Sequence, residues 1–488
     1  MKDMNWIAVY PELLLLAMAL VVTMVDLWVT DPKRTPTYLL TQISLAAVAG
    51  LHLASFDAGI TVYGMQRMVV TDPMGHLLGF FAALSTMITL AYARPYAESR
   101  DMLRGELFTL AMFSLLGIEV MLAANNFLVI YLGLELMSLS LYALTALRRD
   151  HEQATEAAMK YFVLGALSSG FLLYGLSMMY GATGSLDIPQ VFDAIATGQI
   201  NKTVLAFGLV FIVSGLAFKL GVVPFHMWVP DIYHGAPTVV TLLIGGAPEF
   251  AAFAITFRLL VEGLSGLAAD WQQMLVVLAV GSLVIGNFVA IAQTNLKRML
   301  AYSTIGQMGF MLLGFTPTVI AGNTLSAANG YSSALFYLVA YVFTTLGTFG
   351  MIMLLSRAGF EADQLNDFKG LNRRNPWYAF VTLLLMFSMA GIPPTVGIYA
   401  KLSVLEAVLN AGYVWLTVVA VLLSLVGVFY YLRIVKLMYF DEPETDAAIL
   451  PQGDFKILLS ANGIAILAFG IFPQALIGLC AYAIQQSI

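Results

Sequence analysis

Four charged side chains inside long apolar stretches of this chain, where charge is costly, are candidates for chemistry. The segment "LAFKLGVVPFHMWVPD" carries Lys219, and residues 204–218 before it contain no charge. Glu135, Glu249 and Lys401 lie in similar surroundings. Ionisable groups at membrane depth mark ion pathways, and a buried amino or carboxyl group readily gains or loses a proton. These residue types therefore indicate proton transfer.

Two further charges lie near the ends of apolar stretches. Lys160 is four residues after Glu156, on the same helical face. We expect Lys160 to join the proton relay, although its long side chain could simply reach the membrane interface. Arg258 is expected to be an interfacial anchor. For Lys219 and Lys401, the competing interpretation is a purely structural ion pair.

Prolines accompany both buried lysines. Pro224 follows Lys219 by five residues, and the pair Pro393 and Pro394 precedes Lys401. Proline removes a backbone donor and breaks the helical ladder, and transporters use such broken helices at their binding sites. We therefore expect breaks in the helices that carry the lysines.

The polar segment "PFHMWVPDIYHGAPT" contains His226, Asp231 and His234. Their spacing matches no common metal-ligand pattern, so we expect proton exchange or loop anchoring here and no metal site. The single cysteine, Cys480, excludes a disulfide framework and cysteine-ligated iron–sulfur clusters within this chain. The sequence has neither a phosphate-binding loop nor a dinucleotide fingerprint.

The composition is that of an all-α polytopic membrane protein. Of the 488 residues, 60% are hydrophobic and 11% are charged, and the mean hydropathy is +0.85. A helix needs about 20 apolar residues to cross a bilayer. The sequence predicts about fourteen such spans: 9–30, 37–57, 72–94, 106–123, 125–147, 157–181, 203–224, 236–261, 272–292, 298–316, 327–356, 376–410, 413–436 and 457–483.

Positive charges alternate along these spans. Seventeen of the 23 Lys and Arg residues fall on the odd-numbered connections, which predicts a cytoplasmic location for those connections and a periplasmic one for both termini. Two proline-broken helices, each with a lysine, are the seventh and the twelfth spans, five positions apart in the predicted order. We infer two inverted five-helix repeats, formed by spans 4–8 and 9–13. The predicted regions are 1–105, 106–261 and 272–436, followed by a C-terminal loop and last helix over 437–488.

Three segments carry a family resemblance. "FKLGVVPFHMWVPDIYHGAPT", "QTNLKRMLAYSTIGQMGF" and "MAGIPPTVGIYAKLSVL" closely resemble the antiporter-like membrane subunits of NADH-quinone oxidoreductase, respiratory complex I. The similarity covers nearly the whole chain and is greatest to the bacterial subunit N group. It implies a proton-translocating subunit in the bacterial inner membrane, without a redox centre of its own. NADH, FMN, iron–sulfur clusters and quinone are expected in partner subunits, which include further antiporter-like subunits.

The resemblance also assigns the relay residues. Glu135, Lys160, Lys219 and Lys401 match the ionisable residues of the family's fifth, sixth, seventh and twelfth helices. Glu249 departs from the family, which usually has a lysine there, and Gln307 stands where some members have histidine. The alternatives are an Mrp-type cation/proton antiporter subunit, a membrane subunit of an energy-converting hydrogenase, and a purely structural membrane anchor. Lysines argue for protons, because sodium prefers oxygen ligands.

Overall fold

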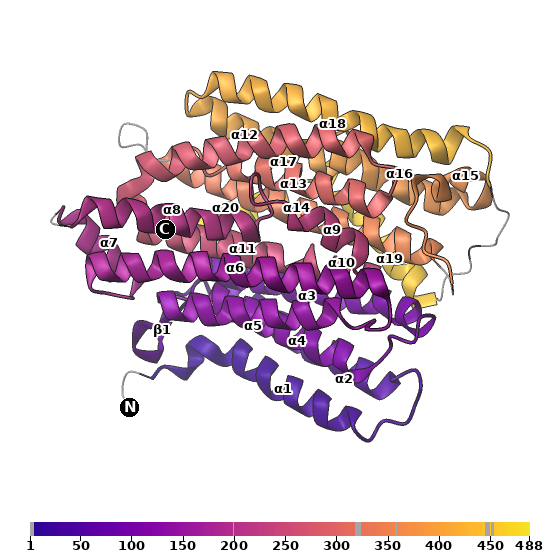
Figure 1. Cartoon of the computed structure of the whole chain (residues 1–488), viewed down its shortest axis with the longest axis horizontal. Helices are drawn as coiled ribbons and strands as arrows, with labels where there is room; N and C mark the ends of the chain where they lie inside the picture. Colours follow the sequence, from indigo (N-terminus) through magenta and orange to yellow (C-terminus); the bar gives the residue numbers. More distant parts are fainter. Residues whose placement is uncertain (1–3, 199, 318–323, 357–358, 445–448, 450–452) are drawn as a thin grey trace.

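Long helices running roughly parallel to one another make up almost the whole molecule (Figure 1). The computed structural model describes residues 4–198, 200–317, 324–356, 359–444, 449 and 453–488. The first elements are η1 (Trp6–Val9), α1 (Tyr10–Asp26), α2 (Thr35–Ala58), β1 (Val62–Gly64), η2 (Met65–Arg67), β2 (Val69–Thr71) and α3 (Pro73–Glu98). The strands pair antiparallel as a small hairpin between α2 and α3.

The rest of the chain consists of helical segments. The first half contains α4 (Gly105–Leu122), α5 (Phe127–Thr145), α6 (Glu152–Thr183), α7 (Ile188–Ala196), α8 (Lys202–Lys219), α9 (Trp228–Gly235), α10 (Thr238–Ile244), α11 (Ala247–Thr256), the π-helical turn η3 (Phe257–Gly263) and η4 (Ser265–Leu267). The second half contains α12 (Ala268–Ala292), α13 (Leu296–Leu313), α14 (Thr324–Leu355), η5 (Leu365–Phe368), α15 (Leu371–Arg374), α16 (Pro376–Ala390), α17 (Val396–Asn410), α18 (Val414–Phe440), α19 (Gly453–Ile471) and α20 (Gln474–Gln485).

Among the described residues, twelve helices are long and apolar enough to cross a membrane. They match twelve of the fourteen predicted spans. The other two predicted spans are α13, which is more polar, and the pair α16 and α17. The last predicted span is divided between α19 and α20. The prediction of a helical, multi-spanning membrane protein is therefore confirmed.

The predicted helix breaks are also confirmed. α8 ends at Lys219 and the chain resumes helix only at Trp228, while α16 ends at Ala390 and α17 begins at Val396. A glycine with positive φ follows each helix end, Gly221 at +63° and Gly391 at +79°. Glycine adopts this conformation without steric cost, so the chain turns there before each proline segment.

The eighth predicted span contains a break that the sequence analysis did not anticipate. α10 ends at Ile244, and α11 starts at Ala247 after two glycines. Glu249 therefore lies in the first turn of a new helix. Helix starts leave backbone N–H groups without helical partners, so this region is more polar than a continuous helix.

Two helix pairs have matching local structure. α4 packs against α5 in the first half as α12 packs against α13 in the second. Asn126 caps α5 and donates a 2.6 Å hydrogen bond to Asp187. Asn295 caps α13 and donates a 2.8 Å hydrogen bond to Asp363. In each half, a capping asparagine therefore joins the start of a helix to an aspartate in a distant loop.

Arg258 is not a surface anchor. Its side chain is buried, with only 1% of the residue exposed, and it forms 2.7 Å ion pairs with Asp72 and Glu262. It also donates to the carbonyl of Leu122. The prediction of an interfacial anchor was wrong, because two carboxylates and a free helix carbonyl satisfy this guanidinium inside the protein.

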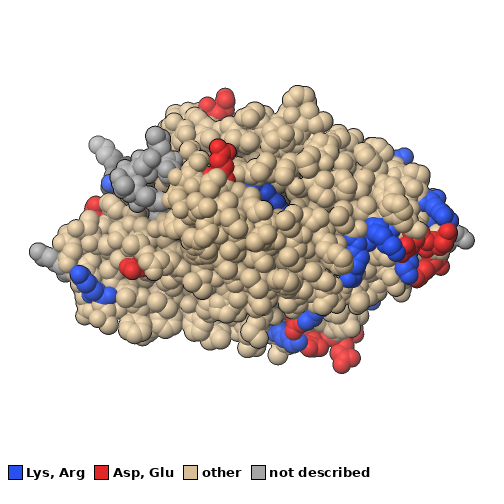
Figure 2. Space-filling model, turned by 90° about the horizontal axis from the view of Figure 1, so that it is seen from above, with Lys and Arg blue, Asp and Glu red and all other residues tan. Residues whose placement is uncertain are grey.

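The surface carries little charge along its middle. Figure 2 shows a face that is largely uncharged, with most of its Lys and Arg near one end. We call this the basic end. It includes the connection after α1, with Lys33, and the connections before α4 and α16, with Arg100 and Arg373.

Candidate proton-transfer site

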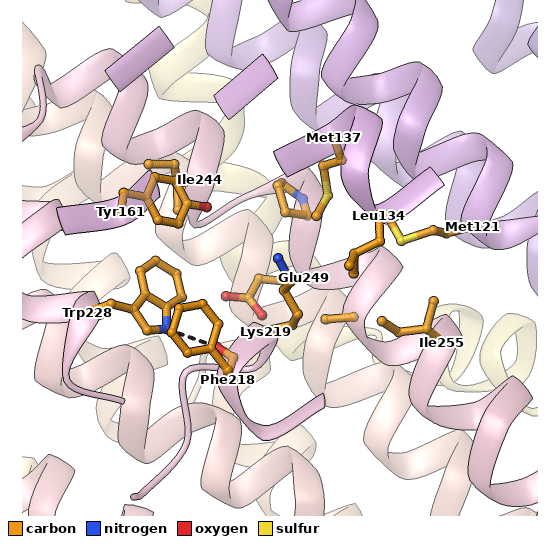
Figure 3. A pocket seen from close by; sticks show the side chains of 12 residues that line it. Met121, Leu134, Met137, Tyr161, Phe218, Lys219, Trp228, Ile244, Glu249 and Ile255 are labelled. Carbon is orange, nitrogen blue, oxygen red and sulfur yellow. Dashed lines mark hydrogen bonds between the residues drawn. The ribbon is translucent and has the colours of Figure 1, made fainter. Parts of the chain in front are cut away.

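Lys219 and Glu249 line one internal cavity of about 30 Å³. Lys219 is the last residue of α8, and Glu249 is in the first turn of α11. Figure 3 shows the amino group and the carboxylate directed into this space, which is otherwise lined by residues such as Phe218 and Trp228. A cavity of this size holds a water molecule. The two helix ends thus bring opposite charges to one enclosed space.

Glu249 has no direct protein partner for part of its carboxylate. The residue is 6% exposed, and its Oε2 is buried without a hydrogen-bond partner in the described structure. No ion pair of 4.0 Å or less joins it to Lys219 within that same part of the chain. An unpartnered buried carboxylate oxygen is costly, so this group either takes up a proton or binds water.

Glu135 lies on α5 beside the same lysine. Lys219 donates a 2.9 Å hydrogen bond to Ser138, three residues along α5 from Glu135, and interacts electrostatically with Glu135 itself. Glu135 Oε1 is buried without a partner among the described groups. The predicted pair is therefore close in space, while the contact that holds the lysine is a serine hydroxyl.

Lys401 lies at the second helix break. Its amino group donates 3.0 Å to the carbonyl of Ala390, the last residue of α16, and 2.9 Å to Ser424 on α18. It also borders a cavity of about 10 Å³ that Gln307 and Ser388 help to line. The broken helix supplies a carbonyl that an intact helix would have used internally. This explains how the lysine is held among apolar helices.

Polar side chains connect the two lysine regions. Tyr341 on α14 interacts electrostatically with Glu249 and hydrogen-bonds Thr304 at 2.7 Å. The same tyrosine lines the Lys401 cavity. Gln307 accepts a hydrogen bond from Tyr337, which also lines that cavity. Tyr341 therefore lies within electrostatic range of Glu249 and borders the cavity of Lys401.

Sequence reasoning did not find the two tyrosines. Tyr337 and Tyr341 are four residues apart and share one face of α14. Both are nearly inaccessible, at 3% and 5% exposed. Paired tyrosines at helical spacing in an otherwise apolar span were the available signal, but tyrosine is also common in ordinary cores.

Lys160 lines neither the Lys219–Glu249 cavity nor the Lys401 cavity. Its amino group pairs with Glu156 at 2.8 Å and Asp231 at 2.9 Å, and 43% of its side chain is exposed. Asp231 also pairs with Arg298 at 2.9 Å. These four residues border a cavity of about 250 Å³ at the basic end. The expected Glu156–Lys160 contact is present, and the lysine belongs to a partly solvated ion cluster.

A second polar cavity, of about 100 Å³, lies next to that cluster. His234 borders both cavities, and Glu361 and Lys297 line the second. Glu361 accepts hydrogen bonds from Tyr96 and Arg100, each at 2.8 Å, and from Thr238. This carboxylate therefore joins α3, the start of α10 and the loop after α14.

The charges around this cavity shift the acidity of its residues. Burial raises the pKa of the Glu361 carboxyl, but Lys297, Arg100 and the hydrogen bonds lower it further, so its pKa is below the ordinary glutamate value. Burial lowers the pKa of His234, and Lys297 acts in the same direction. At neutral pH, Glu361 is thus an anion and His234 is a neutral imidazole.

Known proteins resemble this chain in sequence and in structure. The sequence model described as NADH:quinone oxidoreductase/Mrp antiporter, TM, matches residues 124–427. The NADH-quinone oxidoreductase subunit N of Herminiimonas arsenicoxydans is 60% identical over 492 aligned positions, which cover 100% of both chains.

Two solved structures have a similar fold. A chain of respiratory complex I from Thermus thermophilus, determined with bound aureothin, has a TM-score of 0.80 and 29% identity, covering 96% of this chain and 99% of that one. A chain of the Mrp complex from Dietzia sp. DQ12-45-1b has a TM-score of 0.84 at 22% identity, with 99% and 97% covered, and shows the shared fold alone. With its length fully matched at high identity, the chain belongs to the family of NADH-quinone oxidoreductase subunit N.

Proposed function

We propose that this chain is a proton-translocating membrane subunit of NADH-quinone oxidoreductase, in which Glu135, Lys219, Glu249 and Lys401 form the proton relay. The observation that carries this proposal is the shared cavity of Lys219 and Glu249, whose polar surroundings continue to Lys401. Acidic and basic groups in one enclosed space can exchange a proton directly or through one water molecule.

Ser138 and Glu135 set the state of Lys219 in this mechanism. While the lysine is charged, it donates to Ser138 and is attracted by Glu135. When a proton leaves Lys219 for Glu249, both groups become neutral and the attraction to Glu135 is lost. A neutral pair costs less in an apolar interior than two separated charges, so the transfer is accessible.

The hydroxyls of Tyr341 and Thr304 provide the path between Glu249 and Lys401 in this proposal, and Gln307 lines the Lys401 cavity. Each hydroxyl can donate and accept one proton at the same time, whereas an apolar side chain in the same place would interrupt the path. Lys401 then receives a proton at the second helix break. These side chains between Glu249 and Lys401 would thus let a proton cross between the two halves of the chain without placing a charge in lipid.

We further propose that the halves are inverted five-helix units, formed by the fourth to eighth and the ninth to thirteenth spans. Support comes from the matched α4–α5 and α12–α13 pairs, and from the two asparagine caps. An odd number of spans separates equivalent helices, so one unit is inverted relative to the other. In this arrangement the seventh span of one unit and the twelfth span of the other each combine a helix break with a buried lysine, Lys219 or Lys401.

The basic end is proposed to face the bacterial cytoplasm, with both termini on the periplasmic side. Positive charge at one end supports this orientation. The two cavities beside His234 then form the cytoplasmic entrance to the relay, with Lys160 as a residue of that entrance. Lys160 would thus act at the entrance of the pathway, whereas Lys219 and Lys401 act in its buried part.

The partners in this proposal are the other subunits of the complex, including further antiporter-like subunits. NADH, FMN, iron–sulfur clusters and quinone belong to those partners. This chain would use the energy released there only through movement of its own charges. An Mrp-type antiporter, by contrast, would exchange sodium for protons.

Glu135→Ala and Lys219→Ala test the relay in the assembled complex. Both variants should contain normal amounts of complex but show strongly reduced proton pumping and quinone-coupled turnover. Pumping is measured in membrane vesicles as NADH-driven acidification, and complex content by NADH oxidation with an artificial acceptor. Wild-type pumping in both variants would reject the relay, and sodium-dependent pumping would favour the Mrp-type function.

A further inference from the structure

A second group of buried ionisable side chains lies among the first four long helices. Glu12 is in the first turn of α1, His52 is in the last two turns of α2, His76 is in the first turn of α3, and Glu119 is in the last turn of α4. Because these helices alternate in direction, all four residues lie at the end opposite to the basic end. We call them the N-terminal cluster.

The N-terminal cluster is continuous. His52 Nε2 lies 2.9 Å from Glu119 Oε2, and His52 Nδ1 lies 3.2 Å from His76 Nδ1. Glu12 interacts electrostatically with both Glu119 and His52. Their exposed fractions are 0% for Glu119, 3% for His52, 6% for His76 and 8% for Glu12. Water is therefore nearly excluded from His52 and its two close neighbours, while Glu12, the most exposed of the four, acts on them electrostatically.

This arrangement requires shared protons. Two imidazole nitrogens that face one another form a hydrogen bond only when one of them carries a proton and the other does not. Glu12 Oε2 and both oxygens of Glu119 have no hydrogen-bond partner in the described structure, and Glu119 Oε2 meets His52 Nε2 as a close 2.9 Å contact. Two bare carboxylates this close would repel one another, so a proton on one of the groups is strongly favoured.

Three charged residues next to the N-terminal cluster, Asp72, Arg258 and Glu262, pair with one another. His76 interacts with Asp72, whose carboxylate is held by Arg258, and Arg258 also pairs with Glu262. Arg258 is therefore shared between Asp72 and Glu262, and none of the described ion pairs joins a Lys or Arg side chain to the N-terminal cluster. Protons on the cluster itself are the remaining source of positive charge.

A glycine makes the close contacts possible. A Cβ atom on Gly79 would lie 2.6 Å from His52 Cε1 and 2.8 Å from Glu119 Oε2. Any larger residue would push the imidazole and the carboxylate apart. Met121, two residues after Glu119 on α4, lines the Lys219–Glu249 cavity. The N-terminal cluster and the relay are thus adjacent regions of the same helix packing.

We propose that Glu12, His52, His76 and Glu119 form a second proton-binding site, which exchanges protons with the water at the end opposite to the basic end. A proton on Glu119 passes to His52 Nε2 while the proton on His52 Nδ1 passes to His76 Nδ1. The products are a Glu119 carboxylate and a His76 imidazolium, so charge and protons balance. The proposal rests on the proton-translocating function proposed above.

A metal ion is a poorer occupant than a proton. No group of three or more His, Cys, Asp or Glu side chains in the described segments has a geometry that could hold a metal ion. The facing Nδ1 atoms and the single imidazole–carboxylate contact form a linear series instead. Such a series suits hydrogen bonds.

The test uses the intact complex in proteoliposomes, with His52→Gln, Glu119→Gln and the double variant. Proton pumping per NADH oxidised is measured as a function of pH, and complex content is measured separately. Each single change should displace the pH profile by about one unit or more, because a neighbouring charge within a few Å is lost. The double variant should match the larger single effect, because coupled residues are not additive.

Glu106→Gln is the matched control, since Glu106 is an exposed glutamate at the other end of α4. Gly79→Ala disturbs the contact without removing a titratable group, and it should displace the profile in the same direction as His52→Gln. Profiles that superimpose on the wild type would overturn the proposal. So would a uniform loss at all pH values, or loss of the assembled complex in all of these variants, because both indicate a structural role. Glu135→Ala, tested in parallel, separates failure of this site from failure of the relay.

Discussion

Lys219 donates a 2.9 Å hydrogen bond to Ser138, whereas Glu135 on the same helix acts on it electrostatically and keeps its Oε1 without a partner among the described groups. The lysine is therefore held by a neutral hydroxyl, with the carboxylate acting at longer range. A direct ion pair would lock both charges, whereas this arrangement leaves the lysine able to release its proton. The hydroxyl thus becomes part of the relay's mechanism.

Ser138→Ala should reduce proton pumping roughly tenfold, because hydrogen bonds to charged groups contribute about 1.5–3 kcal/mol. Without the hydroxyl, the Lys219 amino group either turns to Glu135 or stays uncharged. Ser140→Ala is the control, since Ser140 is buried on the same helix and its hydroxyl donates to the backbone carbonyl of Leu136, one turn earlier. Equal pumping by the two variants would show that Ser138 has no special role.

Gly391→Ala should impair pumping through Lys401. An added Cβ would lie 2.8 Å from Lys401 Cδ, so the lysine must move away from Ala390 and Ser424. Gly412→Ala is a closely matched control: it has a φ of +88°, compared with +79° for Gly391, and nothing lies within 4 Å of its added Cβ. Both variants pay a similar backbone cost of about 1–2 kcal/mol.

The comparison is made at equal complex content, with pumping per NADH oxidised as the readout. A Gly391→Ala complex that pumps as well as Gly412→Ala would mean that Lys401 tolerates displacement. That result would weaken its assignment as a relay residue at the second helix break.

Glu361→Gln should lower the stability of the assembled complex at neutral pH by about 2–4 kcal/mol, because a charged acceptor of several hydrogen bonds is lost. The pKa of Glu361 is depressed in the folded chain. The stabilisation is therefore present above the unfolded pKa of a glutamate and is lost as pH falls through the folded value.

The readout is thermal unfolding of the purified complex between neutral and acidic pH. The wild type should lose stability on acidification, while Glu361→Gln should start lower and depend less on pH. If the stability of the two proteins falls equally with decreasing pH, protonation of Glu361 is not the cause of the loss. Glu444→Gln is a control, since this glutamate pairs with Lys369 on the exposed loop at the same end.

The helices and their breaks follow from local features of the sequence. Long apolar runs predict spans, and the prolines after Lys219 and before Lys401 predict where two of them stop. The break before Glu249 was missed because two consecutive glycines are tolerated in many membrane helices. The local sequence is compatible both with a continuous helix and with a break at this point.

The N-terminal cluster and the placement of Arg258 depend on contacts between distant segments. Glu12, His52, His76 and Glu119 each look like one polar residue near a helix end, which is unremarkable when taken singly. Only the packing of four helices brings them together. Lys160 is a further example, because its partner Asp231 lies 71 positions along the chain and holds it in a partly solvated cluster.

Glu249 offers the sharpest test of the relay, since the related family usually has a lysine at this position. Glu249→Gln keeps the shape of the side chain and removes its titration, so we expect pumping to be lost with the complex intact. Glu249→Lys restores a titratable group and should keep part of the pumping. It should not reach the wild-type rate, because Lys219 shares the cavity and a helix start interacts unfavourably with positive charge.

The expected order of pumping is therefore wild type, Glu249→Lys, then Glu249→Gln. Glu406→Gln is the control, because Glu406 is an exposed glutamate on the membrane helix α17. Normal pumping by Glu249→Gln would exclude a titrating role and leave Glu249 as a fixed polar group near Lys219. An inactive Glu249→Lys together with an inactive Glu249→Gln would instead show that the site needs a carboxylate, because neither a neutral amide of the same shape nor another titratable group replaces it.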